Sequence, residues 1–556
     1  MQILIILLLL ITRFFGSNLH PISPYWEEVA LGYDAYSISQ TARDHHGNFL
    51  PLTAFVSFGD YKPSLYFYTI VPFIKVLGSN LLAVRLPTIL ASLMMVLGVA
   101  FLAKKIAILF LEIKEPKQLS LIFNLGLLVG ALSPWLLYFS RSAWESTLAS
   151  AFVLWGSIFG LLFWEKNKIK FFAFSLLCFV LATYTYHATR LSAPLIGILG
   201  VVFYCIDAFR TPKTWNFVRR HYGKLIALVL AAGILWAPVG QSMFLQSGQQ
   251  RIAETSIFND LSIIETSNAL RAKHDYSLWS RIVYHRFVLF GLEISKNFFS
   301  HFDFDYLFVH GDHNPRHSIQ TFGNFYALDS MLLLIGLVFL FKKEKRLVVF
   351  LVLALIATIL PASFTTATPH ALRTLAAWPV FMLILVFGAW QLYQLTHALL
   401  QKRWLFTLVL VLYLSLASKF FTDLLYHYPS TYRHEWQFGY EEMIDKLGEV
   451  QANFDQIYVT RENGRPSMYY FFYRHIDPSL VQSFDSQAPK DQGEFLEFQN
   501  IKFIDLPSQI TLEESQKILV ISSEQFYQNN FSATQWQLID QTADKEWVFY
   551  VNSLQK

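Results

Sequence analysis

The segment PYWEEVALGYDAYSISQTARDHHGNFLPLTAFVSFGDYKP, residues 24–63, decides how the rest of the chain is interpreted. It is rich in carboxylates, aromatic side chains and turn residues. A short apolar stretch precedes it, and a largely apolar region follows it as far as residue 422. A polar segment framed in this way indicates a surface loop held in place by membrane helices, so it is the first candidate for a functional site.

The composition is that of a membrane protein. Of 556 residues, 54% are apolar and 52 are Phe, and the mean hydropathy of +0.37 is too high for an ordinary soluble chain. The net charge of +4 is too small to suggest a nucleic-acid partner. Cys178 and Cys205 both lie in apolar runs and predict no disulfide framework.

Apolar runs predict about eleven membrane spans, which must be helical because a helix satisfies its own backbone in lipid. The first, MQILIILLLLITRFFG, resembles a signal sequence but lacks a basic n-region and a small-residue cleavage site, so we expect it to remain uncleaved. The others are predicted at 81–103, 119–139, 143–164, 171–187, 190–207, 225–243, 326–341, 346–362, 374–397 and 404–422.

Basic residues concentrate in alternate loops, around 104–117, 165–170, 210–224, 342–346 and 401–403, which predicts that these loops are cytoplasmic. The predicted outer loops are 17–80, 140–144, 187–190, 244–325, 363–373 and the chain after 422. The Tyr-rich run 65–78 is too short to span, so we expect a helix at the outer interface there and another in a later outer loop.

The tail is polar and mixes helical and strand patterns. Residues 441–452 have helical periodicity, whereas 456–460, 517–522 and 547–551 are typical of strands. The predicted fold class is therefore an α-helical polytopic membrane protein with a small C-terminal extracytoplasmic α/β domain. The expected domains are 1–422 and 423–556.

Two motifs in segment 24–63 carry candidate chemistry. Glu27 and Glu28 are adjacent acids, and a positioned carboxylate can remove the proton of an attacking hydroxyl. Lys62 precedes Pro63, which favours an extended backbone, and its ammonium can neutralise a phosphate. The alternatives are a solvated acidic loop and a lysine that only reaches toward the membrane surface.

Three other outer turns also combine ionisable residues. Arg141 and Glu145 lie four residues apart in SPWLLYFSRSAWESTL (133–148), a spacing that would put them on one helical face. Glu145 is a candidate second acid, and the alternative is a helix cap. TYTYHATRLSAP (183–194) and TTATPHALRTLAAWP (365–379) each offer a guanidinium suited to phosphate, and the alternatives are structural hydrogen bonding and interfacial anchoring. The residues concerned are His187, Arg190, His370 and Arg373.

The segment HFDFDYLFVHGDHNPRHSI (301–319) holds four His, three Asp and one Arg. It matches no tight zinc pattern such as H-E-x-x-H. We therefore predict a polar substrate pocket built by Asp312, Arg316 and His317. We predict no metal site and no certain cofactor, because no ligand motif supports a divalent metal.

As a set, these motifs resemble a known family. PYWEEVALGYDAYSI…DHHGNFLP…FGDYKPSLY, followed by AVRLPTILASL, is similar to bacterial membrane glycosyltransferases of the glycosyltransferase C superfamily. The branch is the one related to protein O-mannosyltransferases and lipid A aminoarabinose transferase. LSPWLLYFSRSAWESTLA, TYTYHATRLSAP, FVHGDHNPRHSI and PHALRTLAAWP also resemble that branch, so the resemblance covers residues 1 to about 425.

The resemblance implies a sugar transfer from a polyprenyl-phosphate donor to an acceptor hydroxyl, by inverting single displacement without a covalent enzyme intermediate. The family's acidic motif, usually Asp-Glu, falls on Glu27 and Glu28. Either can be the base, and Glu27 is favoured. The family's lysine falls on Lys62, which is implied to hold the lipid phosphate, and its second outer acid falls on Glu145.

In some members of the family an acid directly precedes that lysine. Here Tyr61 intervenes and Asp60 is one place further away, so the resemblance does not carry a metal role over to Asp60. With the donor and acceptor bound, the predicted pocket includes Asp60, Tyr61, His187, Asp312, Arg316, His317 and His370.

The expected partners are a polyprenyl-phosphate hexose or pentose donor, a lipid, glycan or protein acceptor, and membrane lipids, but no nucleic acid. The expected location is the bacterial plasma (inner) membrane, with the site and the C-terminal domain on the extracytoplasmic side. The alternatives are a transporter and a lipid-binding scaffold. Transporters place ionisable groups near the bilayer midplane, whereas the acids here collect at one predicted surface. A scaffold would tolerate loss of Glu27.

Overall fold

The computed structural model describes residues 2–17, 19–244, 255–398, 403–485, 489–491, 493–511, 516–530, 536–544 and 546–552. They form two compact units. The helical unit comprises Met1–Ser17 and Thr88–His427, and the mixed unit comprises Asn18–Pro87 and Tyr428–Lys556. The polar segment 24–63 therefore groups with the tail, whereas the division at residue 422 stays a prediction.

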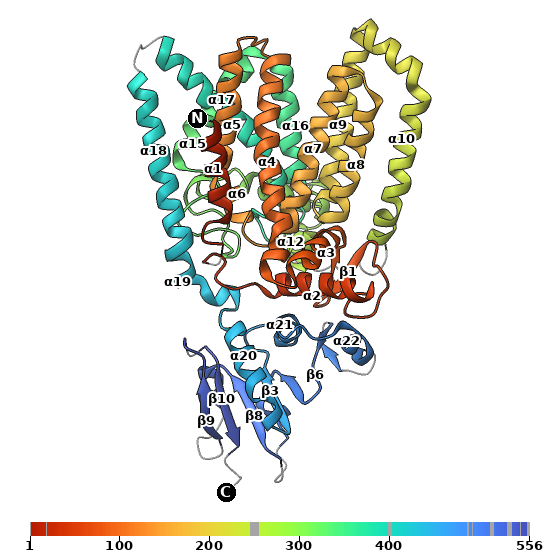
Figure 1. Ribbon diagram of the computed structural model, residues 1–556. Helices are drawn as coiled ribbons and strands as arrows, with labels where there is room; N and C mark the ends of the chain where they lie inside the picture. The colour runs from red at the N-terminus through yellow and green to blue at the C-terminus, as the bar shows by residue number, and fades with distance from the viewer. Residues whose placement is uncertain are drawn as a thin grey trace. The chain divides into compact units, whose positions relative to one another are not determined.

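The helical unit is built from α-helices, and two of its longer connections, after α14 and after α16, carry candidate residues (Figure 1). Its helices are α1 (Gln2–Phe14), α4 (Leu81–Leu109, whose first turns belong to the mixed unit), α5 (Pro116–Leu132), α6 (Pro134–Phe139), α7 (Glu145–Lys166), α8 (Ile169–Thr185), α9 (Thr189–Arg210), α10 (Pro212–Phe244), α12 (Leu261–Lys273), α13 (Leu278–Val283), α14 (Arg286–Ser300), α15 (Ala327–Lys343), α16 (Lys345–Ser363), α17 (Trp378–Ala398) and α18 (Arg403–Thr422). Short helical turns are η1 (Ile257–Asn259), η2 (Asp305–Val309), η3 (Leu375–Ala377) and η4 (Asp423–His427).

Helices occupy all eleven predicted spans. In the described part of the chain, seven helices are long and apolar enough to cross a membrane. The other predicted spans fall on α1, with 13 residues, and on α5, α8 and α15, with 17 residues each. At 1.5 Å per residue, 17 residues extend about 25 Å, slightly less than a hydrocarbon core of about 30 Å. The chain is thus a multi-pass membrane protein, as its composition predicted.

The helices α15 and α17 approach so closely that only glycine fits between them. A Cβ on Gly388 would lie 1.9 Å from the Leu332 carbonyl oxygen, and one on Gly336 would lie 2.0 Å from the Ile384 carbonyl oxygen. Without a hydrophobic driving force in lipid, such close backbone packing is a main source of helix association.

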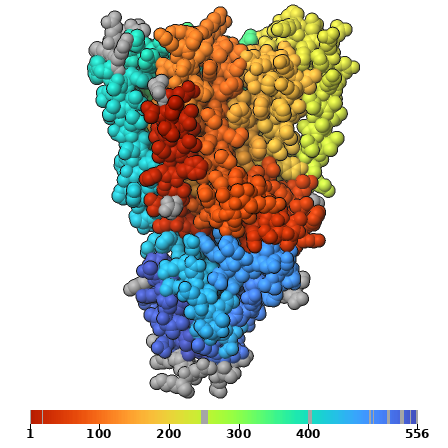
Figure 2. Space-filling view, in the orientation of Figure 1, coloured from red at the N-terminus to blue at the C-terminus, as the bar shows by residue number. Residues whose placement is uncertain are grey.

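The N-terminal helix α1 packs on α5 and lies at the surface of the helical unit (Figure 2). Its outward side chains are aliphatic, among them Ile3, Leu4 and Leu7. At its end the buried Arg13 donates to the carbonyls of Gly130 and Ala131, 3.2 Å and 2.8 Å away, which lack helical partners at the end of α5.

The mixed unit combines the first loop with the tail. Its helices are α2 (Trp26–Thr41), α3 (Leu65–Leu77), α19 (Tyr428–Tyr432), η5 (Arg433–Trp436), α20 (Tyr440–Val450), η6 (Gln451–Asn453), α21 (Pro466–Tyr473), α22 (Pro478–Asp485), η7 (Pro507–Gln509) and α23 (Glu524–Asn530). Its strands are β1 (Ala54–Ser57), β2 (Asp60–Pro63), β3 (Gln456–Thr460), β4 (Lys490–Asp491), β5 (Glu494–Phe495), β6 (Glu497–Phe498), β7 (Ile501–Ile504), β8 (Ile518–Ser522), β9 (Trp536–Gln541) and β10 (Val548–Asn552).

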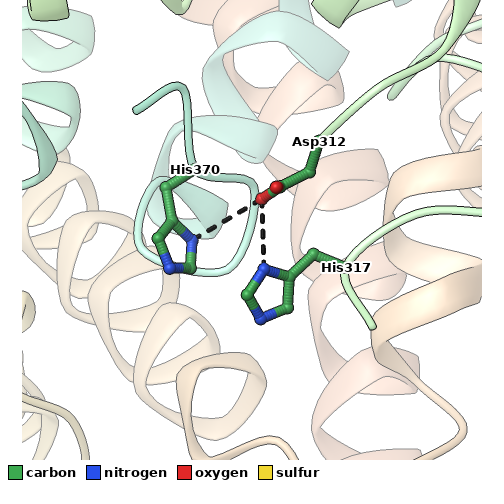
Figure 3. Close-up of side chains that lie close together, drawn as sticks. All are labelled: Asp312, His317 and His370. Carbon is green, nitrogen blue, oxygen red and sulfur yellow. Dashed lines mark hydrogen bonds and ion pairs between the residues drawn. The ribbon is translucent and has the colours of Figure 1, made fainter. Parts of the chain in front are cut away.

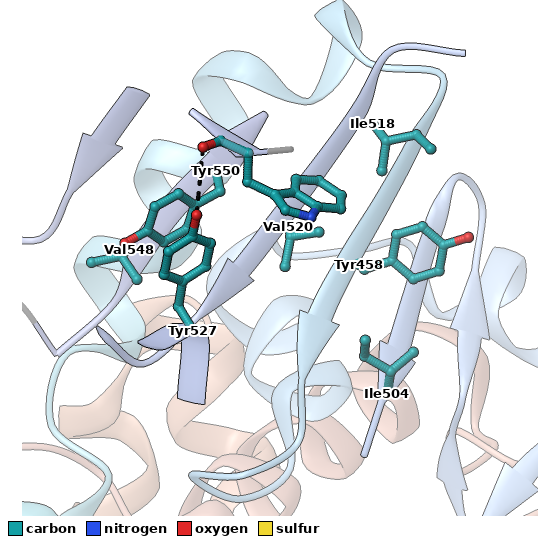
Figure 4. Close-up of a cluster of buried hydrophobic side chains, with 8 residues drawn as sticks. Tyr458, Ile504, Ile518, Val520, Tyr527, Val548 and Tyr550 are labelled. Carbon is teal, nitrogen blue, oxygen red and sulfur yellow. Dashed lines mark hydrogen bonds between the residues drawn. The ribbon is translucent and has the colours of Figure 1, made fainter. Parts of the chain in front are cut away.

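Six of these strands form one sheet in the order β6-β7-β3-β8-β10-β9. Strand β3 is parallel to β7 and β8, whereas β10 is antiparallel to β8 and β9. A buried cluster that includes Tyr458, Val520, Tyr527 and Tyr550 covers one face of the sheet (Figure 4). The predicted strands at 456–460, 517–522 and 547–551 and the predicted helix near 441–452 are confirmed as β3, β8, β10 and α20.

The first loop is fixed to the tail within this unit. The Tyr33 hydroxyl on α2 donates to the Ile476 carbonyl at 3.0 Å, and the Tyr469 hydroxyl on α21 donates to the Pro24 carbonyl at 2.7 Å. Gly32 provides the room for this packing, because a Cβ there would lie 2.5 Å from the Phe472 ring.

Candidate active site

The start of α2 and the β1–β2 hairpin bring a carboxylate and an ammonium together. Phe58 and Gly59 link the strands, both with positive φ, which matches the two-residue turn whose twist suits a hairpin. That turn sets the register in which Lys62 lies in β2, and its Nζ is 2.8 Å from Glu27 Oε1 and 3.9 Å from Asp60 Oδ2. The site therefore joins two residues that the sequence motifs had singled out separately.

The neighbouring Glu28 has a different environment. Arg85, near the start of α4, donates through its Nε to Glu28 Oε1 at 2.8 Å and through a terminal nitrogen to Oε2 at 2.9 Å. Both side chains are buried, with exposures of 4% for Glu28 and 6% for Arg85. The Glu27 side chain is 34% exposed, so of the two acids it is the accessible one. Arg85 stands within the motif AVRLP, but no local pattern indicated its partner.

A second ionisable network in the mixed unit was not predicted. His45 Nδ1 is 2.7 Å from Asp34 Oδ1, and both groups are buried. His46 Nδ1 is 2.6 Å from Asp485 Oδ1, which is also 2.7 Å from Lys490 Nζ. Because the pair His46–Asp485 joins opposite ends of the chain, no sequence spacing could reveal it.

Burial and charge act against each other in this network. Burial lowers the pKa of His45, but the charge and hydrogen bond of Asp34 outweigh it, so the pKa lies above its ordinary value. For His46, the effects of burial and of the nearby His45 are larger than the opposing effects of the carboxylates, so its pKa is lowered. The pKa is therefore raised for His45 and lowered for His46, because only His45 is paired with a fully buried carboxylate.

In the helical unit, three of the predicted motifs lie against one another. The Tyr138 hydroxyl donates to the Pro315 carbonyl at 3.0 Å, and Trp135 Nε1 donates to the Ala371 carbonyl at 3.2 Å. The Trp144 ring contacts the His317 ring with a centroid distance of 5.8 Å. Residues 133–148, 301–319 and 365–379 therefore form one cluster, as their shared placement in outer loops had suggested.

At the centre of this cluster Asp312 lies between two histidines (Figure 3). Its Oδ2 is 3.2 Å from His317 Nδ1 and 3.7 Å from His370 Nδ1, and it accepts from the Ala371 amide at 2.8 Å. Burial raises the pKa of Asp312, but His317 and two backbone amides outweigh that effect and hold it below its ordinary value. All three side chains are buried.

The remaining candidates occupy helix starts and loops. Glu145 is the first residue of α7, and it is buried. Arg141 precedes that helix, and its guanidinium donates to the Thr12 and Phe15 carbonyls at 3.0 Å and 2.6 Å, so the pairing of Arg141 with Glu145 stays a prediction. This arrangement fixes the end of α1.

The basic candidates of the helical unit are also positioned by backbone and side-chain contacts. Arg190 is buried in the first turn of α9, and His187 lies in the turn before that helix. Arg373 donates to Thr365 Oγ1 at 2.6 Å, and the Arg316 amide donates to Asn314 Oδ1 at 3.0 Å. The candidate residues thus form two groups, one in each unit.

The helix order, the close α15–α17 packing and the C-terminal sheet define a polytopic membrane protein with a C-terminal α/β region, as the sequence predicted. Two crystal structures of ArnT from Cupriavidus metallidurans share this fold, one bound to undecaprenyl phosphate and one in the apo state. Their TM-scores are 0.55 and 0.52, and each is 12% identical, covering 99% of this chain and 98% of ArnT.

The archaeal oligosaccharyltransferase AglB from Archaeoglobus fulgidus, in complex with an inhibitory peptide and a dolichol-phosphate, matches more loosely. Its TM-score is 0.40 at 10% identity, over 85% of this chain and 63% of AglB. No protein-family model and no curated protein matches the chain. At these identities the likeness to ArnT shows the fold, and the reaction has to be argued from the residues.

Proposed function

We propose that the chain is a glycosyltransferase that moves a sugar from a polyprenyl-phosphate carrier to an acceptor hydroxyl. The observation that carries this proposal is the ion pair of Glu27 and Lys62, which places a base beside a cation at the start of α2. The likeness to ArnT bound to undecaprenyl phosphate supports a lipid phosphate as the donor's carrier.

In this proposal Glu27 acts as the general base. The acceptor oxygen attacks the anomeric carbon while Glu27 takes the hydroxyl proton, and the bond from that carbon to the phosphate oxygen breaks. The polyprenyl phosphate leaves with the electron pair, and the configuration inverts in one displacement. Glu27 suits this role better than Glu28, because a base must reach the substrate and Glu28 is enclosed by Arg85.

Lys62 stabilises the leaving group. Negative charge develops on the phosphate as the glycosidic bond breaks, and a positioned cation lowers the energy of that transition state. Without donor, Glu27 neutralises the Lys62 ammonium at 2.8 Å. When the donor binds, its phosphate replaces Glu27 as the partner of Lys62, which leaves the carboxylate available to the acceptor.

The helical unit carries candidates of its own. Glu145 is proposed as a second acid near the substrate, and Arg190 and Arg373 as further phosphate ligands. We place the reaction on the extracytoplasmic side of a bacterial plasma membrane, because basic residues mark the opposite loops. The proposed donor sugar is a hexose or pentose, and the acceptor is a lipid, glycan or protein hydroxyl. Further substrate contacts are proposed separately for each unit: Asp60 and Tyr61 in the mixed unit, and His187, Asp312, Arg316, His317 and His370 in the helical unit.

The test uses purified chain in lipid nanodiscs and a panel of radiolabelled polyprenyl-phosphate sugars. Glu27→Gln should lose at least about 100-fold in turnover, as expected for a missing general base, while donor binding persists. The matched control is Asp505→Asn, which removes an exposed carboxylate paired with Arg461 in the same unit and should retain turnover. Wild-type turnover in Glu27→Gln would refute the base assignment. Donor binding without transfer by the wild type, under all donors tested, would favour a scaffold.

A further inference from the structure

We propose that Asp312, His317 and His370 bind a divalent transition-metal ion of the zinc class. The inference does not rest on the proposed sugar transfer. Each of the three residues offers one ligand atom, and these atoms all lie within 4.8 Å of one another. In Figure 3 both imidazoles turn their Nδ1 atoms toward the same carboxylate.

Two of the ligand separations are close to the edge of a metal tetrahedron. Zinc holds imidazole nitrogen and carboxylate oxygen at about 2.0–2.1 Å, so two such ligands on one ion are about 3.3 Å apart. The separations from Asp312 Oδ2 to the two Nδ1 atoms, 3.2 Å and 3.7 Å, lie on either side of that value.

The supporting contacts also suit a metal centre. Asp312 Oδ1 accepts from the Asn314 amide at 2.9 Å, and Oδ2 accepts from the Ala371 amide at 2.8 Å. Such outer contacts fix a ligating carboxylate and raise metal affinity. The His370 amide in turn donates to His301 Nε2 at 3.1 Å, which fixes the backbone beside the third ligand.

The types of ligand atom determine which metal ion fits this site. Two imidazoles and one carboxylate suit zinc or iron(II), whereas magnesium and calcium require oxygen ligands. Three protein ligands leave a position for water or a substrate oxygen. The ligands come from two separate loops, which explains why a search for a short motif within 301–319 predicted no metal.

The site would also tie the two loops together. Residues 310–326 and 364–377 connect to each other through Asp312 and the Ala371 amide, and the ion would add bonds that the unfolded chain lacks. Binding should therefore raise the thermal stability of the helical unit as well as its metal content.

The test measures metal content on full-length chain that carries no polyhistidine tag, after chelation and reloading with Zn²⁺. The wild type should retain about one ion per chain, and His317→Ala and His370→Ala should lose most of it. The matched control is His310→Ala, from the same loop, whose imidazole is 59% exposed and pairs with Asp305 at 2.6 Å. It should bind zinc as the wild type does.

A second readout keeps the test decisive if a variant fails to fold. Co²⁺ added to the wild type should give the visible absorption of a tetrahedral nitrogen and oxygen site, and Zn²⁺ should raise the melting temperature of the wild type and of His310→Ala. Equal zinc in His370→Ala and the wild type would overturn the proposal. So would a wild type that retains no zinc and gives no cobalt bands, or one in which Mg²⁺ displaces equimolar Zn²⁺.

Discussion

Replacing Glu28 by Gln should unfold the mixed unit at a markedly lower temperature. The change removes the charge of one partner of a buried, bidentate ion pair, so the Arg85 guanidinium, 6% exposed, loses the charge of Glu28. Removing one partner of such a pair destabilises by about 3–5 kcal/mol. For a unit of roughly 200 residues, each kcal/mol shifts the melting temperature by about 2–4 °C, so we expect a decrease of about 6–20 °C.

The adjacent Glu27 provides the internal comparison. Its pair with Lys62 is partly solvated, with side-chain exposures of 34% and 12%, and pairs of this kind contribute about 1 kcal/mol or less. Glu27→Gln should therefore change the melting temperature by no more than about 4 °C while it removes turnover. One acid is expected to act on stability and the other on the reaction.

Thermal unfolding of the purified variants in one detergent, followed by tryptophan fluorescence, measures both effects. The double variant Glu28→Leu with Arg85→Met should recover most of the lost stability, because it removes both buried charges instead of one. A Glu28→Gln protein that melts within 2 °C of the wild type, a margin set at about the effect of 1 kcal/mol, would refute the buried pair. A Glu27→Gln protein that melts as low as expected for Glu28→Gln would show the roles to be reversed.

Three further changes test other parts of the structure. Lys62→Ala should weaken donor binding by about 10- to 100-fold, the value of one charge-assisted contact, and equal binding by both proteins would contradict the phosphate role. Gly388→Ala should prevent close packing of α15 and α17 and so reduce the yield of monodisperse protein, whereas Gly233→Ala, which meets nothing within 4 Å, should be neutral. Because Asp34 raises the pKa of His45 despite burial, the stability from that pair should be complete below pH 6.5 and should decrease as pH rises through the folded pKa. Melting temperatures across this range should lose that slope in His45→Gln.

Apolar runs were sufficient to predict the helices, because burial in lipid requires long stretches without charge. The helix ends were harder to predict. The span predicted to end at 103 continues as α4 to Leu109, past two lysines, and Lys105 Nζ there pairs with both oxygens of Glu165 at 2.8 Å and 2.9 Å. A charge that finds a partner on a neighbouring helix does not end a helix, and the partner is visible only in three dimensions.

Candidate residues could be predicted where a short motif carries the chemistry, as for Lys62 before Pro63. The pairing of residues could not be predicted where the partners come from separate segments. Asp312 and His370 belong to two loops, and the contact of His46 with Asp485 joins the first loop to the tail. Such pairs depend on how the elements pack, and no local spacing encodes that packing.

The choice between Glu27 and Glu28 shows the same limit on a smaller scale. In sequence the two acids are equivalent, but on a helix of 3.6 residues per turn adjacent side chains point about 100° apart. At the start of α2 the Glu28 side chain points inward to Arg85, and the Glu27 side chain points to the hairpin that carries Lys62. The buried acid is therefore paired with a buried guanidinium, and the accessible acid with an ammonium that binds the donor phosphate in the proposed reaction. Because adjacent positions of α2 face these two environments, the register of this single helix decides which glutamate is accessible enough for the proposed role of base.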